Sequence, residues 1–464
     1  MNTDKNAGIH LKICAVLVLA LLCPCMASPL EKDKSTDPVP GPETIVKKIR
    51  ITGLRYTDPA AVKREILNIE GQPFDPELLD RDRNALEGMG IFASVSIHTV
   101  RDEGGVTLDY RFRELPPVIP FISVKVTDQN GWIAGPAVAL LSLFGSAIRI
   151  EGYARTTVYP ELYRAKEYLL YADSRWTGRL PLEYQVWLIM NDSYNPLKEY
   201  NEESQIGYVD LFYRVRKKIK VLCSCGFYRV MHDPDADYFT AGDKPEKMFL
   251  SSGTSDHVPF AATGLIWDSR DHLTNTHNGL YQELRVSLFG GPLGGPAHYR
   301  EYLTDTRIFH TIRERNILHL GLLGQFRPGT MGAYDFFHVG GPNSLRTWNP
   351  DSSYYGQHEL LCTAEYRYEI IRRRYFRIFD FDLFIGLQVV AGTDAAVLWG
   401  TGQNPEGGRR YAAVYSGIHI LFPGFNRLRL EGGINRFDRH DKHFRFGFTA
   451  GLWEKTIVQR WRIR

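Results

Sequence analysis

Alternation of apolar and polar residues dominates the chain from residue 116 to its end. Residues 283–288 read E-L-R-V-S-L, residues 427–431 read R-L-R-L-E, and residues 444–452 read F-R-F-G-F-T-A-G-L. Successive side chains of a β-strand point to opposite faces of a sheet, so each segment predicts a strand with one apolar and one polar face. No convincing amphipathic helix separates these segments. We count fifteen or sixteen candidate strands and predict sixteen, because an even number is the rule when such strands form a bacterial membrane barrel.

A sheet with one apolar face can belong to a soluble sandwich or to a membrane barrel. The apolar face forms the core of a sandwich, whereas in a barrel it meets lipid and the polar face lines the lumen. Aromatic residues make up 12% of the sequence, which suits the aromatic girdles of a barrel. Together with an export signal, this favours a mainly β fold, with a transmembrane antiparallel β-barrel over residues 116–464.

The N-terminal residues have the pattern of a secretory signal. A basic start precedes an apolar run from Ile13 to Leu22, and the small residues Ala27 and Ser28 follow. The run is too short to span a bilayer, so we predict a signal peptide over residues 1–27. Cys23 leaves a lipoprotein as an alternative, although Leu22 is bulky for lipid attachment. Residues 28–43 contain four prolines and predict an extended linker.

Residues 44–115 predict a compact unit in the order strand, helix, helix, strand, strand. Asp58-Pro59 and Asp75-Pro76 each have the pattern of a helix start, with Asp as the N-cap and Pro in the first turn. The order, and the L-x-x-x-G-x-F pattern of residues 86–92, resemble a single POTRA domain. A generic small α+β domain is the alternative.

The loop after the middle of the predicted barrel has an unusual composition. Residues 340–348 read G-G-P-N-S-L-R-T-W, with no acidic residue between Asp335 and Asp351 to pair with the arginine. A planar guanidinium can bind a carboxylate through two parallel hydrogen bonds. The candidate site residues in this loop are Gly340, Gly341, Ser344, Leu345, Arg346 and Trp348.

This loop resembles the G-G-x-x-S-[VL]-R-G-[FY] loop of the BamA/TamA-like outer-membrane superfamily, which includes two-partner secretion transporters. A second motif, residues 267–271 (W-D-S-R-D) with Gly279, resembles the family's D-x-R-D element. A third, residues 364–367 (A-E-Y-R), resembles its E-[YF]-R strand. The candidate barrel-motif residues are Asp268, Arg270, Asp271 and Gly279.

The chain departs from the family pattern at several positions. Thr347 stands where the family has Gly, and Thr276 where it has Pro. Val390 occupies the usual acidic position of a later strand, with Asp394 four residues on. These departures bear on how the arginine loop is held.

We predict that Arg346 enters the lumen and pairs with Glu365. Tyr366 and Tyr368 fall on one face of the strand that begins at Ala364, and Glu365 falls on the other. The aromatic face suits lipid, so Glu365 should point inward. Asp394 is a candidate second acceptor.

Nothing in the sequence predicts an enzyme, a cofactor or a metal site. Motifs of the G-x4-G-K and G-x-S-x-G kinds are missing, and the three cysteines after the signal have no zinc-site spacing. The 56 Lys and Arg residues against 53 Asp and Glu leave a net charge of +3. This balance argues against a nucleic-acid partner.

The resemblance implies an outer-membrane protein that assists insertion or translocation of other polypeptides. Its periplasmic POTRA domain would offer a strand edge to unfolded or extended clients, and its barrel would contact outer-membrane lipid. A seam between the first and last strands could then open sideways. A passive pore or structural barrel with a POTRA tether is the alternative.

Overall fold

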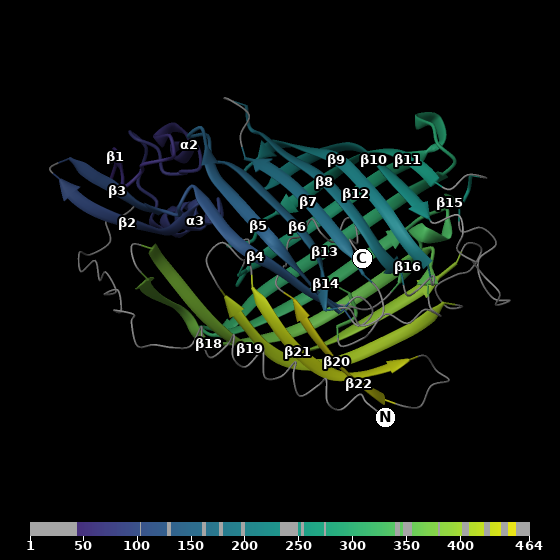
Figure 1. Cartoon of the computed structure of the whole chain (residues 1–464). Coiled ribbons are helices and arrows are strands. Elements are labelled where there is room, and N and C mark those ends of the chain that lie inside the picture. The colour runs from purple at the N-terminus through teal and green to yellow at the C-terminus, as the bar shows by residue number, and fades with distance from the viewer. Residues whose placement is uncertain are drawn as a thin grey trace.

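The computed structural model describes residues 44–451 except 103, 128–130, 160–163, 176–179, 196–199, 233–248, 252–254, 273–274, 339–343, 347–354, 379–380, 401–407, 422–426 and 438–443. The predicted signal peptide and linker therefore lie outside the described residues. The described chain forms a small α+β unit followed by one large curved sheet, and Figure 1 shows the small unit at one end of that sheet. No described helix is long and apolar enough to cross a membrane.

The small unit has the predicted order of elements. It contains β1 (Val46–Thr52), α2 (Pro59–Lys63), α3 (Pro76–Glu87), β2 (Phe92–Asp102) and β3 (Gly105–Glu114). The strand order is β1-β3-β2, with β1 parallel and β2 antiparallel to β3. Asp58 and Asp75 cap the two helices by accepting from the backbone N–H groups of Ala60 and Glu77. We call this unit the POTRA unit.

One carboxyl group lies in the middle of the POTRA unit. Asp82 of α3 is fully buried and accepts from the Tyr110 hydroxyl at 2.6 Å, the Leu67 N–H at 2.6 Å and the Asn68 amide at 3.3 Å. Burial raises the pKa of Asp82, an effect that these hydrogen bonds only partly offset. Burial and the neighbouring carboxylate raise the pKa of Tyr110 as well.

The large sheet contains sixteen long antiparallel strands, which confirms the predicted fold class. In chain order they are β4 (Val118–Thr127), β5 (Gly131–Leu143), β6 (Ile148–Tyr159), β7 (Lys166–Ser174), β8 (Leu182–Asn195), β9 (Tyr200–Arg216), β10 (Ile219–His232), β11 (Ser255–Asp268), β12 (Gly279–Gly290), β13 (His298–Arg313), β14 (Asn316–Phe326), β18 (His358–Ile378), β19 (Phe381–Trp399), β20 (Arg409–Leu421), β21 (Leu428–Phe437) and β22 (Phe444–Gly451). Short elements fill the loops: η1 (Gly291–Leu293), β15 (Gly329–Thr330), η2 (Ala333–Asp335), β16 (Phe337–His338) and β17 (Tyr355–Gly356).

The two faces of this sheet have an inverted polarity. On β12, Leu284 is 51% exposed, whereas its neighbours Glu283 and Arg285 are 2% and 5% exposed. Charged side chains therefore lie in the interior and large apolar side chains lie on the outer face. This is the arrangement of a barrel with a polar lumen and a lipid-facing exterior, and it excludes a sandwich with an apolar core.

One junction of the large sheet has no strand register among the described residues. Fifteen ladders join the successive long strands from β4 to β22. β22 and β4 are neighbours in the strand order. Among the described residues no register pairs these two strands, and we call the gap between them the seam.

The POTRA unit contacts the turns at one end of the sheet, which we call the POTRA end. The Asp58 N–H donates to the Gly145 carbonyl in the β5–β6 turn at 2.9 Å. Arg175, which follows β7, donates to the carbonyls of Ala85 and Gly88 at the end of α3. The loop between β14 and β18, which contains Arg346, lies at the opposite, distal end.

Candidate functional site: a buried arginine inside the sheet

The predicted arginine loop sends a short segment into the interior. Of its candidate residues, the structure describes Ser344, Leu345 and Arg346, and all three are buried. Leu345 is fully buried in an apolar cluster with Phe337 and Leu361. Gly340, Gly341 and Trp348 lie outside the described residues.

Arg346 contacts three carboxylates on three strands, β18, β19 and β21. Its Nε and Nη2 donate to the two oxygens of Asp394 on β19, each at 2.9 Å, and its backbone N–H donates to Oδ2 at 3.1 Å. Its Nη1 donates to Glu365 on β18 and, at 3.4 Å, to Glu431 on β21. The guanidinium also stacks on the Tyr415 ring, 3.9 Å from the ring centre. These acceptors cover its polar edge, and the ring covers one face.

The carboxylates are themselves held in place. Glu365 accepts from Arg367 and, at 2.9 Å, from the Tyr415 hydroxyl. Asp394 accepts from the Thr363 hydroxyl at 2.9 Å. Glu365, Asp394 and Arg367 are close to fully buried, so loss of one charged partner would leave an uncompensated charge.

The register of the sheet explains why these residues meet. Glu365 lies opposite Gly392, and Gly392 lies opposite Tyr415. A Cβ atom at Gly392 would lie 2.4 Å from the Tyr415 hydroxyl and 2.7 Å from the Ala364 carbonyl. Because Gly392 has no side chain, Tyr415 can cross the neighbouring strand and reach Glu365.

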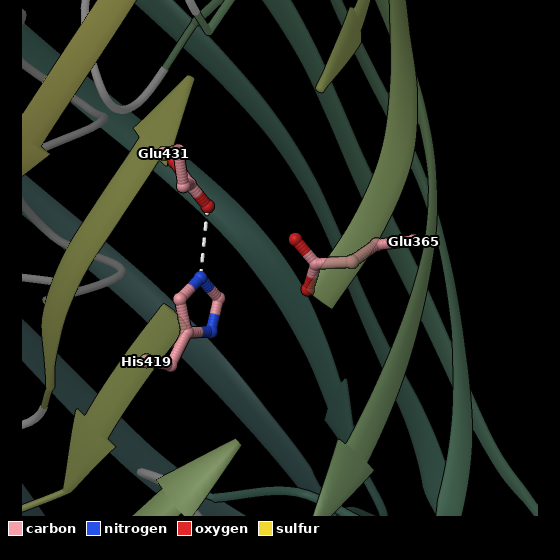
Figure 2. A group of neighbouring side chains, drawn as sticks. All are labelled: Glu365, His419 and Glu431. Carbon is pink, nitrogen blue, oxygen red and sulfur yellow. Dashed lines mark hydrogen bonds and ion pairs between the residues drawn. The ribbon is translucent and has the colours of Figure 1, made fainter. Parts of the chain in front are cut away.

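Glu365, His419 and Glu431 form a group whose donor atoms lie within 4.8 Å of one another. Figure 2 shows the carboxylate of Glu365 pointing toward the other two residues, which are joined by a 2.8 Å hydrogen bond. Such a set of carboxylates and imidazole can ligate a metal ion in principle. In this structure Nη1 of Arg346 already bonds both glutamates, so the guanidinium supplies the positive charge that a metal would bring.

The second predicted motif forms a separate structure at the POTRA end. Arg270 donates to both oxygens of Asp268, at 2.9 and 2.7 Å, while Asp271 accepts from two backbone N–H groups that precede β12. Gly279 has a φ of +121°, and a Cβ there would lie 2.5 Å from the Ser269 carbonyl. Among the described residues no hydrogen bond or ion pair joins this motif to Arg346. Its residues stabilise a turn.

A second buried arginine holds the start of the same loop. Arg327 follows β14 and donates to Glu301 at 2.7 Å and to the Asp335 carbonyl at 2.7 Å. Its guanidinium stacks on the Phe337 ring at 3.9 Å. Arg327 therefore fixes the loop where it leaves the sheet, and Arg346 fixes it inside.

The sequence predictions for Arg346 named Glu365 and Asp394 but missed Glu431 and Tyr415. Glu431 shares a predicted strand face with Arg427 and Arg429, so its alternation pattern could have placed it in the interior. No comparable signal marked Tyr415, because its position depends on a glycine of the neighbouring strand.

Comparisons with known proteins agree with this architecture. A family model described as Omp85 superfamily domain matches residues 156–452. A POTRA model described as surface antigen variable number repeat matches residues 44–115. No curated protein sequence matches the chain.

Solved structures share the fold at low sequence identity. BamA from Haemophilus ducreyi lacking POTRA domains 1–3 is similar with a TM-score of 0.51 and 13% identity, over 92% of this chain and 89% of that chain. CdiB from Escherichia coli gives a TM-score of 0.55 and 12% identity, over 92% and 94%. CdiB from Acinetobacter baumannii gives 0.52 and 13%, over 88% and 74%.

The predicted family resemblance is thus confirmed by the family model, by the POTRA match and by the fold. An inverted-polarity sheet of sixteen strands, a preceding POTRA unit and an arginine loop folded into the interior together have one explanation: the chain belongs to the Omp85 superfamily.

Proposed function

We propose that this protein resides in the outer membrane and inserts or exports other polypeptides there. Residues 44–115 form a periplasmic domain that receives clients, and residues 116–464 form the barrel. The outer face of the barrel contacts lipid. The distal end then faces the extracellular medium.

The observation that carries this proposal is the seam between β4 and β22, a junction for which the described residues give no strand register. Backbone N–H and C=O groups without partners are costly in a bilayer, so an open strand edge there is a place for another strand to pair. An extended client can use such an edge without a specific sequence, because pairing uses backbone groups.

The Arg346 cluster ties the loop between β14 and β18 to the inner wall of the sheet. Its carboxylates come from β18, β19 and β21, and Arg346 of the loop between β14 and β18 binds all three. We infer that the cluster locks this loop inside the lumen and braces the wall that leads to the seam.

A crosslinking experiment tests the proposal. Cys223, Cys225 and Cys362 are first changed to serine, and pairs of cysteines are then placed between residues 119–121 of β4 and residues 449–451 of β22. The control pair is Leu430→Cys with Ala450→Cys, whose residues lie directly opposite on the paired strands β21 and β22. The variants are purified and reconstituted in liposomes with an unfolded eight-stranded barrel as the client.

We expect oxidised seam pairs to stop client insertion and the oxidised control pair to leave it intact. Reduction should restore insertion. Insertion that continues through a crosslinked seam would refute this route. Conductance in the absence of any insertion by the unmodified protein would instead assign the chain as a passive pore.

A further inference from the structure

An apolar groove crosses the outer face of the sheet toward its distal end. It has a volume of 620 Å³ and runs over β11, β12, β13, β14 and β18 as far as Trp399 at the end of β19. Leu284, Tyr302, Phe326 and Leu360 form its walls. Its volume falls in the range of roughly 300–1,000 Å³ that is typical of small-molecule sites.

The groove exists because two small residues lie side by side on neighbouring strands. Thr304 on β13 is directly opposite Gly324 on β14, which in turn is opposite Leu360 on β18. A Cβ atom at Gly324 would lie 3.0 Å from the Thr304 methyl group and 3.7 Å from Leu360. The missing side chain therefore leaves the hollow, and a larger residue there would fill it.

Gln282, a polar residue beside the groove, is hydrogen-bonded within the protein. Gln282 points to the outer face, where its amide donates to the Thr304 hydroxyl at 3.1 Å and accepts from the Thr306 hydroxyl at 2.6 Å. Such pairing is what a polar side chain needs when water is excluded. The groove thus offers a hydrocarbon-like surface.

Aromatic side chains border the distal end of the groove. The ring centres of Tyr302 and Phe326 are 6.3 Å apart, those of Phe326 and His358 are 4.3 Å apart, and those of His358 and Trp399 are 5.3 Å apart. Aromatic belts mark the level where the hydrocarbon of a bilayer gives way to headgroups. The groove accordingly lies in the leaflet at the distal end, directly below that level.

Arg300 lies on β13 on the distal side of the groove. It precedes Tyr302 by two residues on β13 and shares its outward face, while the intervening Glu301 is 2% exposed and points inward. Arg300 is exposed, and among the described residues no carboxylate pairs with it. A guanidinium at the headgroup level is suited to bind a phosphate through two hydrogen bonds.

We propose that this groove is a specific lipid site, which holds one acyl chain of the phosphorylated glycolipid of the outer leaflet with a phosphate on Arg300. We assign this lipid because the groove lies at the distal end, which faces the outer leaflet, and the outer leaflet of an outer membrane carries the phosphorylated glycolipid. The proposal rests on the outer-membrane location proposed above and is independent of client insertion.

Native mass spectrometry of the full-length protein tests the site. The protein is delipidated in detergent and titrated with lipid A or, separately, with phosphatidylglycerol. Gly324→Leu fills the groove and Arg300→Gln removes the charge. Arg313→Gln removes an exposed arginine from the POTRA end of the same strand, and Val414→Leu enlarges an exposed apolar residue on β20, so these two variants are the matched controls.

We expect lipid A to bind at least about tenfold more weakly to Gly324→Leu and to Arg300→Gln than to the unmodified protein or the controls. Heat-modifiable migration in gels shows whether each variant is folded. If Gly324→Leu does not fold, Leu360→Phe fills the same groove from its side wall.

Equal lipid A binding by a folded groove-filling variant overturns the site, and stronger binding of phosphatidylglycerol than of lipid A overturns the assigned lipid. The insertion assay described above should be unchanged in these variants, which separates this inference from the proposed function.

Discussion

Arg346 binds both oxygens of Asp394, through Nε and Nη2 at 2.9 Å each, while its backbone N–H makes a third bond to the same carboxylate. Glu365, the partner expected first, receives one bond from Arg346 and also accepts from Arg367 and Tyr415. Among the described residues, only Thr363 donates to Asp394 besides Arg346. The two acids therefore depend on the arginine to different degrees.

This difference predicts unequal energetic coupling. Arg346→Ala should destabilise the folded protein by about 3–5 kcal/mol, because it leaves buried carboxylates without their cation. Double-mutant cycles measure the coupling free energy between two substituted residues. The coupling of Arg346→Ala with Asp394→Asn should exceed that of Arg346→Ala with Glu365→Gln. Urea unfolding in detergent, followed by heat-modifiable migration, gives the free energies.

The lysine variant provides the control for charge alone. Arg346→Lys retains the positive charge but cannot make the two-point contact with Asp394, so most of the stabilisation should be lost. Additive effects of Arg346→Ala and Asp394→Asn would contradict the clamp.

A second prediction concerns Gly392. Gly392→Ala should displace Tyr415 from the Arg346 cluster, because the new Cβ would lie 2.4 Å from the tyrosine hydroxyl and 2.7 Å from a backbone carbonyl. We expect the free energy of unfolding to fall by about 1–3 kcal/mol, which is typical of overpacking, as measured by the same unfolding assay. Gly321→Ala on β14 is the matched control, since its Cβ has no contact closer than 3.5 Å. Equal effects of the two substitutions would contradict this role of Gly392.

A third prediction concerns pH and the POTRA unit. The pKa of Asp82 is raised above its usual 3.8, mainly by burial. Between the usual pKa and the raised pKa, Asp82 is therefore protonated in the folded state and ionised in the unfolded chain. The contribution of Asp82 to the free energy of unfolding is complete below the usual pKa, and it falls as the pH rises through the raised pKa. Urea unfolding of residues 44–115 as a function of pH measures the slope.

Asp82→Asn should remove this part of the pH dependence. The control is Asp80→Asn, because Asp80 lies on the same helix but is exposed and pairs with Arg83. An unchanged slope in Asp82→Asn would show that another group titrates. We expect residues 44–115 to fold alone, and their failure to do so would contradict this expectation.

A fourth prediction concerns the strand edge of the POTRA unit. β2 is an edge strand, and Val100 on it is 53% exposed. Along an edge strand, successive N–H groups point alternately toward the paired strand and away from it, so either Thr99 or Val100 has its N–H directed away from β3. Proline at that position removes the N–H. One of the variants Thr99→Pro and Val100→Pro should therefore abolish weak client binding while the unit stays folded. Binding of unfolded barrel segments is measured by NMR titration. Val100→Thr changes the side chain but keeps the N–H, so it should bind normally; undiminished binding by both proline variants would exclude pairing at β2.

Sequence alone determined the features that depend on local patterns. Period-2 alternation placed Glu283 and Arg285 on one face and Leu284 on the other, and the structure has them buried and exposed as a lipid-facing barrel requires. The Asp-Pro pairs marked both helix starts of the POTRA unit. Alternation along one strand also predicted that Glu365 points inward. Each of these properties is set by residues within a few positions of one another.

Tertiary structure decided which residues meet across strands. Asp394 became the main partner of Arg346 because β18 and β19 pair Thr363 with Asp394, a register that no local pattern specifies. Tyr415 joined the cluster only because Gly392 lies opposite it, and the outer groove exists only because Thr304, Gly324 and Leu360 fall in one row on three strands. Cross-strand neighbours far apart in sequence depend on the register of every intervening strand. The chain pattern therefore determines the faces of the barrel, and strand pairing determines the site.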